Sequence, residues 1–419
     1  MLICFLSTVH TARDKRVFEK EAVSLAEAGH EVVHLCPGDE PETVERGVRI
    51  VTYQPAHGLL RRALGLVSLY RRARTIGADC YHCNEVDSWL VGVALKVMAR
   101  PLLVFDVHET FPHDLAEFHA PRVLRPPVVG AVRALFRLLV PFTDKLVLAK
   151  HSVAVDFPGA EAKQILVQNF VPLRMLARGA GGATPTVRVS SGTVTAVHVG
   201  LISRVRGWPV LVEALASEEA AGVHLTVIGE FNDGSQADFE ARVAELGLRD
   251  RVRTIGWIAA TEAFREVERA DIGLVMFQPG FRSHTDSLPH KLFDYMLAGL
   301  PVIVPDFGAV VAGIVRDAEC GLLVDPSDSR AVARALGALA RNPEERRRMG
   351  DNGRRSVLEK YNWEAEAKQL VGMYAAFAAR AHPGATERSE RATRPERADE
   401  AASEGAGRGV RGAKPLGKD

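Results

Sequence analysis

The chain has 419 residues, of which 47% are hydrophobic and 25% are charged, and its formal net charge is +1. This length can hold two domains with complete cores, and the composition is that of an ordinary globular protein. The near-neutral charge gives no reason to expect a nucleic-acid partner. The sequence contains no run of about 20 apolar residues, so no membrane span is predicted.

Strand and helix patterns alternate through residues 1–177, the predicted first domain. The chain opens with an apolar strand at 2–6 that lacks the basic region and cleavage site of a signal peptide, which predicts a cytoplasmic location. A helical pattern over 16–28 follows, and further strands are predicted at 31–36, 79–83 and 102–107. This alternation predicts a parallel sheet with helices on both faces.

The cysteines predict no metal site. Their number is odd, five, and their neighbours are apolar, which favours reduced thiols in a cytosol. Cys80 and Cys83 have the spacing of half a zinc site, but no second Cys or His pair at suitable spacing completes it. We therefore expect buried thiols on a strand, and neither a metal nor another cofactor.

A second alternation begins after a segment of small residues. Residues 178–193 are rich in Gly and Ala and are predicted to be a flexible linker. Residues 194–361 form the predicted second domain, with strands at 194–199, 223–228, 252–255, 272–276 and 302–304 and helices at 209–216 and 239–246. Two successive α/β halves predict two Rossmann-like domains that face a cleft, with ligands at the carboxyl ends of strands. Residues 381–419 have almost no large apolar side chain and are predicted to be a disordered tail.

Two carboxylates in the second half stand eight residues apart. Asp286 and Asp294 flank a loop that runs into a predicted helix, with Ser287 near the N-cap and Pro289 near the first helical position. A helix start presents unpaired N–H groups and partial positive charge, which suit a phosphate. The two carboxylates can bind hydroxyl groups on either side of a bound diphosphate, so this segment has the parts needed to hold a nucleotide-sugar.

This segment resembles the acidic-x7-acidic motif of retaining glycosyltransferases with the GT-B fold, carbohydrate-active family four. Residues 286–302 are Asp-Ser-Leu-Pro-His-Lys-Leu-Phe-Asp-Tyr-Met-Leu-Ala-Gly-Leu-Pro-Val. The family pattern is Glu-Gly-Phe-Gly-x-x-x-x-Glu-x-Met-Ala-x-Gly-x-Pro-Val, so both carboxylates are one methylene shorter here. The resemblance covers about residues 1–378 and implies that a last helix, 362–380, crosses back to the first domain.

The resemblance also implies donor-binding roles for this segment. Asp294 is expected to bind the ribose hydroxyls of the nucleotide. Asp286 is expected to lie by the donor sugar, as a catalytic residue that supports the positive charge at the anomeric carbon. The backbone N–H groups of Ser287 and Leu288 would face sugar and phosphate, and Lys291 is a further candidate for a phosphate contact.

A loop early in the second domain resembles the diphosphate-binding loop of the family. Arg206 matches the lysine that precedes a glycine there, and Leu201 replaces the family's arginine, with Arg204 as the candidate substitute. Guanidinium groups suit phosphate because they donate in a planar fork. Gly229 ends the next strand, where a ligand can approach the backbone. The alternative interpretation is two solvated loop arginines.

The first half carries candidates for the acceptor side. Residues 106–109 resemble the family's Asp-x-His-Glu, and a His at a strand's carboxyl end can bond a sugar hydroxyl or relay a proton. We therefore predict His108 as a catalytic residue, with a structural histidine as the alternative. Weaker candidates lie in the same or neighbouring loops: His10, Asp14, Arg16, Asn84, Glu109, Lys150 and Asn169.

We therefore predict a hexosyl- or related glycosyltransferase that uses a nucleotide-diphosphate donor and a hydroxyl acceptor. The resemblance implies retention of configuration and no metal, and its most frequent context is cell-surface polysaccharide or glycolipid synthesis. Two alternatives stay open: a non-catalytic, nucleotide-sugar-binding partner of a transferase, and a nucleotide-sugar epimerase.

Two segments indicate contact with an anionic membrane. Residues 59–74 place five arginines among apolar residues, and 127–142 is strongly apolar with Arg133 and Arg137. Basic amphipathic helices lie on anionic lipid, which predicts a peripheral protein on the inner face of the cell membrane. Ordinary amphipathic helices with solvated arginines are the alternative.

Overall fold

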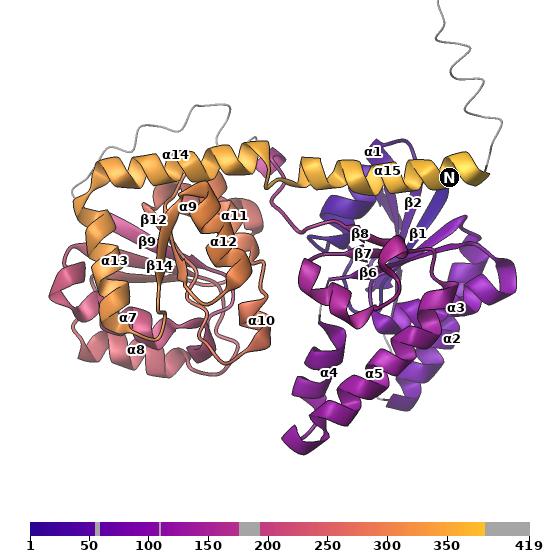
Figure 1. Ribbon diagram of the computed structural model, residues 1–419, viewed down its shortest axis with the longest axis horizontal. Helices are drawn as coiled ribbons and strands as arrows, with labels where there is room; N and C mark the ends of the chain where they lie inside the picture. Colours follow the sequence, from indigo (N-terminus) through magenta and orange to yellow (C-terminus); the bar gives the residue numbers. More distant parts are fainter. Residues whose placement is uncertain (55–58, 109, 176–192, 382–419) are drawn as a thin grey trace, which may run out of the picture. The chain divides into compact units, whose positions relative to one another are not determined.

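The computed structural model describes residues 1–54, 59–108, 110–175 and 193–381, with all side chains in these ranges except those of 59–64, 114, 118, 119, 282, 283 and 381. It contains two sheets, each within its own α/β lobe (Figure 1). The predicted Rossmann-like architecture is therefore confirmed. Most of the predicted linker and tail, residues 178–192 and 382–419, lies outside the described residues.

The sheet of the first lobe has eight strands in the order β3-β4-β2-β1-β5-β6-β7-β8. Their bounds are β1 Leu2–Leu6, β2 Glu31–Pro37, β3 Thr43–Glu45, β4 Val48–Tyr53, β5 Cys80–Cys83, β6 Leu102–Val107, β7 Lys145–Leu148 and β8 Gln164–Leu166. All neighbours are parallel except β3 and β4. Cys80 and Cys83 are buried free thiols on β5, as predicted.

The antiparallel hairpin β3–β4 at the edge of this sheet was not predicted. Its turn contains Arg46 at φ 51° and Gly47 at φ 81°. Two successive positive φ values define the turn type whose twist matches paired strands. Because β3 has only three residues, its alternation is too short to be recognised in the sequence.

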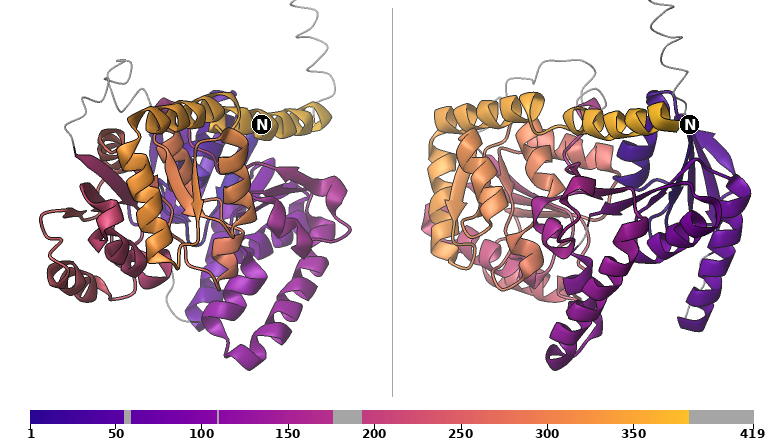
Figure 2. Two further views of the ribbon diagram at one scale, coloured as in Figure 1. Left: turned by 60° about the vertical axis from the view of Figure 1, so that its left-hand side comes forward. Right: turned by 45° about the vertical axis from the view of Figure 1, so that its right-hand side comes forward.

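Helices cover both faces of the first sheet (Figure 2). They are η1 Val17–Ala22, a π-helical turn that continues into α1 Val23–Glu27, then α2 Leu59–Ile76, α3 Val86–Ala99, α4 Phe111–His119 and α5 Arg125–Leu139. The core on the α3 and α5 face is aromatic: Trp89 stacks on Phe105 at 4.1 Å, and Phe136 stacks on Phe157 at 5.1 Å. Such pairs fix the helices against the sheet.

The sheet of the second lobe is fully parallel, in the order β11-β10-β9-β12-β13-β14. The strands are β9 Val194–Val199, β10 Val223–Ile228, β11 Val252–Ile255, β12 Ile272–Leu274, β13 Val302–Pro305 and β14 Gly321–Val324. In chain order this is the 3-2-1-4-5-6 arrangement of nucleotide-binding sheets. Ligands of such sheets bind at the carboxyl ends of strands where the order reverses, here between β9 and β12.

Helices cover both faces of this second sheet (Figure 1). A hydrophobic cluster lies on each face. One packs α7 Trp208–Ala216, α8 Gln236–Glu245 and α13 Ser329–Arg341. The other packs α9 Ala260–Arg269, α11 His290–Leu297 and α12 Ala309–Ala318. Alternate strand residues supply the two clusters, as the side-chain period of two requires: Ala196 faces the first and Val197 the second.

The last two helices are α14 Pro343–Glu359 and α15 Trp363–Ala381. The first turn of α15 bonds to segments of the first lobe, since the indole N–H of Trp363 donates to Ser24 Oγ at 2.9 Å. The carboxylate of Glu366 accepts the backbone N–H of Gln168 at 2.7 Å. The return of the chain that the resemblance implies is thus present at the start of α15. Within the described residues, no helix combines the length and the apolar character that crossing a membrane requires.

Candidate functional site

Two glycines bring the loops after β9 and β10 into contact. Gly200 and Gly229 have φ values of 103° and 138°, and the backbone N–H of Gly200 donates to Ile228 at 2.8 Å. A Cβ atom at Gly229 would lie 2.0 Å from the carbonyl oxygen of Gly200. Only glycine fits there, which explains why the predicted Gly229 stands at this strand end.

Two cationic side chains lie beside these loops. Arg206 and Lys291 both face the ring of Phe277, with 5.3 Å from the guanidinium carbon and 5.8 Å from Nζ to the ring centroid. Burial lowers the pKa of both groups, and the charge of Arg206 lowers that of Lys291 further, to about 7. Neither cation forms an ion pair with a carboxylate in the part of the chain that the structure describes.

His198 supports Lys291 from β9. Its Nε2 lies 3.2 Å from Lys291 Nζ. Burial, and then the neighbouring Lys291, hold the pKa of His198 well below its ordinary value, so the imidazole is neutral. The sequence assigned no role to His198 or Phe277, because only the fold brings them to Lys291.

The motif helix begins later than predicted. Pro289 is the N-cap of α11 with an extended backbone (φ −72°, ψ 131°), and the helix starts at His290. The prediction that Ser287 stands near the N-cap and Pro289 near the first helical position is therefore wrong by one to two residues. Proline's fixed φ fits an extended and a helical backbone equally, so it did not decide the boundary. Ser287 and Leu288 lie in the loop, half-buried.

The two motif carboxylates are both half-buried. Asp286 lies in the turn after the short helix α10 Arg282–Thr285, and Asp294 lies on α11. Burial raises the pKa of Asp294 to about 6, and the charges of Lys15 and Lys20 oppose this rise. The carboxylate of Asp294 has no hydrogen-bond partner among the described residues.

Arg204, the proposed substitute for the missing family arginine, has other partners. Its guanidinium forms an exposed ion pair with Asp238 and lies 5.3 Å from the ring of Trp208. Its backbone N–H donates to Asp233 at 2.8 Å. Arg204 is thus already neutralised, in contrast to Arg206.

The loop after β1 is fixed by a buried carboxylate. Glu85, the N-cap of α3, accepts the backbone N–H groups of Thr8, Val9 and His10 at 2.9 to 3.1 Å. This anchorage directs the His10 ring toward His108, whose Nε2 is 2.9 Å away. The structure therefore brings together two predicted residues that are 98 positions apart in the chain.

Two predicted residues lie beneath that loop. Asn84 is fully buried and its amide donates to Leu6 O at 3.3 Å and Ser7 Oγ at 3.0 Å, which holds the ends of β1 and β5 together. Arg16 is buried and donates to both oxygens of Asp106, at 2.6 and 2.9 Å.

Three other candidates differ in what the structure describes of them. Glu109 lies outside the described residues. Lys150 is half-buried at the start of a short 3-10 helix. Asn169 accepts from Lys20 Nζ at 2.7 Å, and its amide lies 2.7 Å from the His290 ring.

One group of buried ligand atoms has the proximity of a metal site. Atoms of Glu21, His82 and Asp106 lie within 4.8 Å of one another. The guanidinium of Arg16 already lies among them, with Nη2 2.9 Å from Glu21 and 2.6 Å from Asp106. A cation is thus built into this position by the protein itself, which does not suit a metal ion.

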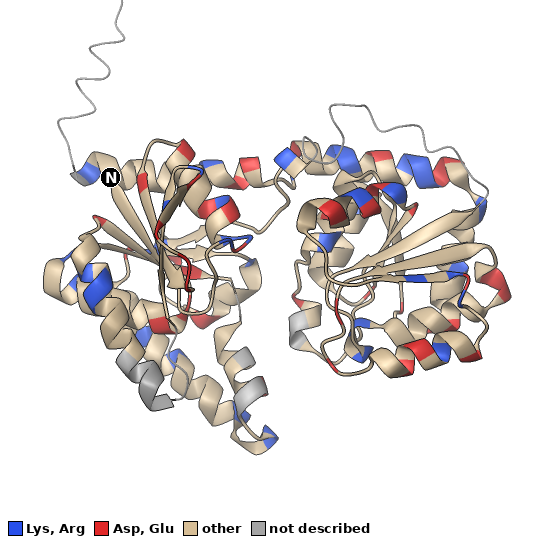
Figure 3. Ribbon diagram, turned by 180° about the vertical axis from the view of Figure 1, so that it is seen from behind, with Lys and Arg blue, Asp and Glu red and all other residues tan. Residues whose placement is uncertain are grey.

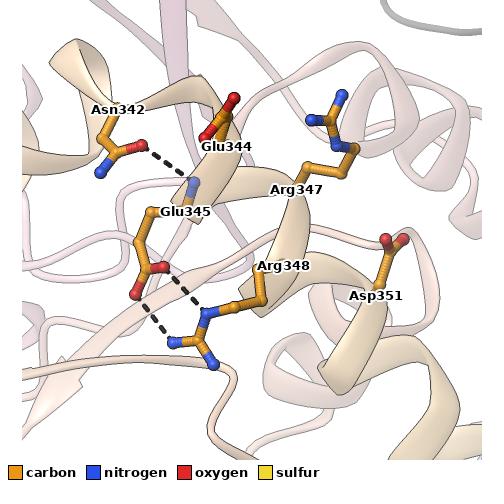
Figure 4. Close-up of a pocket in the computed structure, with 6 residues that line it drawn as sticks. All are labelled: Asn342, Glu344, Glu345, Arg347, Arg348 and Asp351. Atoms are coloured by element: carbon orange, nitrogen blue, oxygen red, sulfur yellow. Dashed lines mark hydrogen bonds and ion pairs between the residues drawn. The ribbon is translucent and has the colours of Figure 1, made fainter.

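A polar depression on α14 carries none of the predicted site residues (Figure 4). Its volume is about 380 Å³, and its lining includes Asn342, which caps the helix through Glu345 N–H, and the Glu345–Arg348 ion pair. These groups satisfy one another on an open helix surface, so they indicate no ligand. Charged residues of both signs occur throughout both lobes (Figure 3).

Two family models match the chain. Glycosyltransferase Family 4 matches residues 16–159, and Glycosyl transferases group 1 matches residues 187–356, which includes the motif helix and the Gly200 loop. The chain belongs to the group 1 glycosyltransferases.

Two relatives are glycosyltransferases by name, and a solved structure shares the fold. The MMP alpha-(1->4)-mannosyltransferase of Mycolicibacterium hassiacum is 34% identical over 136 residues, which are 32% of this chain and 31% of the relative. The D-inositol 3-phosphate glycosyltransferase of Corynebacterium urealyticum is 28% identical over 250 residues, 57% of this chain and 54% of the relative. The chain thus spans about a third to a half of these relatives' length. Anabaena HepE, solved in complex with UDP, shares the fold with a TM-score of 0.67 at 16% identity, over 90% of this chain and 100% of HepE.

Proposed function

We propose that this group 1 glycosyltransferase transfers a sugar from a nucleotide-diphosphate donor to a hydroxyl acceptor. The observation that carries the proposal is the pair of cations, Arg206 and Lys291, that face no carboxylate beside Gly200 and Gly229. A diphosphate would supply the missing negative charge. The pair also stands at the strand ends where the second sheet reverses its order, which is where such sheets bind nucleotides.

The same cations would stabilise the leaving group. As the bond to the anomeric carbon breaks, negative charge develops on the diphosphate, and preorganised cations in a partly buried site lower the energy of that state. Arg206 stays charged at all working pH values, whereas Lys291 would be recharged by the approaching phosphate. This arrangement supports the metal-independent mechanism, because the protein's own cations do what a metal ion does elsewhere.

The motif segment would hold the rest of the donor. The carboxylate of Asp294 is free to accept ribose hydroxyls, and Asp286 would bind the sugar and support the charge at the anomeric carbon. The backbone N–H groups of Ser287 and Leu288, in the loop before α11, would face sugar and phosphate. The resemblance to the family implies that the sugar is transferred with retention of configuration at its anomeric carbon.

On the acceptor side, we propose that His108 binds the reacting hydroxyl. It follows β6 directly, is partly exposed, and is oriented by Asp106, whose carboxylate lies 3.1 Å from Nδ1. A glycan or glycolipid acceptor in cell-surface polysaccharide or glycolipid synthesis is the proposed context. The two relatives, a mannosyltransferase and an inositol-phosphate glycosyltransferase by name, are compatible with a polyhydroxylated acceptor.

The proposed location is cytoplasmic, on the inner face of the cell membrane. Val123 and Leu124, just before α5, are 83% and 52% exposed and flanked by Arg122 and Arg125. Arg133, one of the two arginines in the predicted segment 127–142, pairs with Asp156 at 2.8 Å. The proposed contact therefore includes residues 122–125, just before the predicted segment 127–142, in which Leu138 and Phe142 are also exposed. For 59–74, only the side chains from residue 65 onward are described, and Arg71, Arg72 and Arg74 among them are exposed.

The test is nucleoside diphosphate release from a panel of UDP-, GDP- and ADP-sugars, with and without cell-envelope lipid extract. We expect release from one donor, and a loss of at least about 100-fold in Asp286→Ala and Arg206→Ala. Arg204→Ala is the matched control, because this arginine is already paired, and it should retain activity within about threefold.

Two outcomes would contradict the proposal. Binding of one donor without turnover, even with the extract, would favour a non-catalytic partner. Conversion of the donor sugar without an acceptor would favour an epimerase.

A further inference from the structure

His10 and His108 form the centre of a chain of four side chains at the carboxyl ends of β1 and β6. The two Nε2 atoms are 2.9 Å apart. Nδ1 of His10 lies 3.1 Å from Asp14 Oδ2, and Nδ1 of His108 lies 3.1 Å from Asp106 Oδ2. Each imidazole thus contacts a carboxylate on one side and the other imidazole on its opposite side.

The carboxylates determine where two of the protons are. Burial alone would raise the pKa of Asp106, but Arg16 and His108 outweigh it and hold that pKa well below its usual range. Burial would likewise raise the pKa of Asp14, but His10 and two backbone N–H groups hold it well below. An ionised carboxylate can only accept, so each Nδ1 carries the hydrogen that lies between ring and carboxylate.

The short contact between the rings then requires one further proton. Without it, two nitrogen lone pairs would face each other at 2.9 Å, and with two protons, two N–H groups would. With a single proton, one Nε2 donates to the other. The pair therefore holds three ring protons and one positive charge.

The surroundings favour that charge on His10. Asp14 at 3.1 Å and Glu85 at 3.8 Å both face the His10 ring. The carboxylate beside His108 is already paired with the Arg16 guanidinium. Burial alone would lower the pKa of His10. The charges of Asp14, Glu85 and Asp106 outweigh burial, so this pKa is raised.

The remaining titratable groups that face this chain from η1 and β5 add no net charge. Burial raises the pKa of Glu21 well above its ordinary value, which favours the neutral acid. Burial also lowers the pKa of His82 to about 4, so this imidazole is neutral near pH 7. The balance between the two central rings is thus set by Asp14, Glu85 and Arg16.

We propose that His10 carries the shared proton and the charge, and so presents His108 to the acceptor hydroxyl as a neutral imidazole with its hydrogen on Nδ1. When the acceptor enters, Nε2 of His108 would accept a hydrogen bond from the hydroxyl O–H in place of the one from the His10 N–H. His10 is then a positioning residue. The inference rests on the proposed function for the identity of the hydroxyl, but the protonation state can be measured without any substrate.

The test is ¹⁵N-histidine NMR of the full chain between about pH 5 and 9. We expect His108 as the neutral Nδ1–H tautomer near pH 7, with His10 doubly protonated. Asp14→Asn should lower the pH at which His10 loses its proton. In His10→Gln, an amide N–H still donates to His108, which should keep its tautomer. A proton on Nε2 of His108, or a neutral His10 near pH 7, would overturn the inference.

Kinetics distinguish this inference from the proposed function. His10→Ala should lower donor turnover at least about 100-fold, while His10→Gln should lose less than about tenfold. Binding of UDP, GDP or ADP should be unchanged in both variants. An inactive chain with the expected tautomers would overturn only the proposed function, whereas an active chain with the opposite tautomers would overturn only this inference.

Discussion

At the residue scale, two arginines of the same loop differ in whether a carboxylate pairs with them. Arg204 and Arg206 are two positions apart, but Arg204 pairs with Asp238 whereas Arg206 faces an aromatic ring. The sequence predicted Arg206 and Lys291 as candidates for a phosphate contact, from their positions in the diphosphate-binding loop and in the 286–302 motif. It could not predict the contacts of Arg206 with Phe277 and of Lys291 with His198, because these pairs are about 70 and 90 residues apart and only the folded sheet brings them together.

The lowered pKa of Lys291 predicts proton uptake when a nucleoside diphosphate binds. In the free protein this pKa is about 7, so above that pH the amine is largely neutral, and an adjacent diphosphate would restore its charge. Calorimetry at about pH 8 in buffers of different ionisation enthalpy should show close to one proton taken up. Lys291→Arg should bind without uptake, and Lys291→Ala should bind at least about tenfold more weakly. Uptake that persists in Lys291→Arg would contradict the assignment.

The raised pKa of Asp294 predicts opposite effects on stability and function. Its folded pKa of about 6 exceeds the ordinary 3.8, so the protein loses stability as pH rises through this interval. Asp294→Asn should therefore stabilise the free protein above about pH 6, by at most about 3 kcal/mol, with little gain near pH 4. The same substitution should abolish most donor turnover, because an amide accepts ribose hydroxyls less well than a carboxylate. Thermal unfolding at two pH values measures the first effect, and a destabilised variant would refute it.

At the scale of elements, the strands that the sequence predicted lie close to the observed ones, whereas β3, β4, β7, β8 and β14 were not predicted. Apolar runs such as Val194–Val199 and Val223–Ile228 coincide with the observed strands, because buried parallel strands are continuously apolar. The start of α11 was misplaced since Pro289 fits both backbones. The predicted helix over 16–28 begins instead with a π-helical turn, Val17–Ala22, which no residue pattern marks.

Gly229 provides a test of the contact between the two loops. Gly229→Ala would place a Cβ atom 2.0 Å from a carbonyl oxygen, whereas Gly222, also at positive φ, has open space. We expect Gly222→Ala to cost about 1 kcal/mol of unfolding free energy from backbone strain alone, and Gly229→Ala roughly 3 kcal/mol. Only Gly229→Ala should weaken nucleoside diphosphate binding. Equal effects of the two substitutions in denaturant unfolding would show that the loops are not in tight contact.

At the scale of the whole chain, both sheets reverse their strand order beside the candidate residues. The first sheet reverses at β1 and β5, next to the loop that carries His10, and the second at β9 and β12, next to Gly200. The sequence predicted both α/β halves because the alternation of elements is a strong signal. Which loops meet depends on the order of the strands in the sheet, and this order cannot be deduced from the alternation of strands and helices along the chain.

Removal of metal ions tests the charge supplied by the protein. If Arg206 and Lys291 neutralise the diphosphate, prior treatment with a chelator should leave donor turnover unchanged within about twofold. Turnover of the treated protein is compared with and without added Mg²⁺ or Mn²⁺. A dependence on either ion would contradict the metal-independent mechanism.

Vesicle binding tests the proposed membrane contact. Replacing Val123 and Leu124 together by Ser should weaken sedimentation with phosphatidylglycerol vesicles at least about tenfold, without changing thermal stability. Val44→Ser is the matched control, because Val44 is 69% exposed on β3, away from α5. Equal loss in the control would show that general surface apolarity is being measured.

The unpaired cations have a practical consequence for the handling of this protein. A position with an unpaired guanidinium and an amine that an anion can recharge will bind whatever small anion is abundant, including the phosphate or sulfate of a purification buffer. Such anions raise the unfolding temperature by mass action and compete with the donor. An activity screen run in phosphate would therefore underestimate every nucleotide-sugar, and a stabilising anion in a thermal screen would be an early sign that the site is intact.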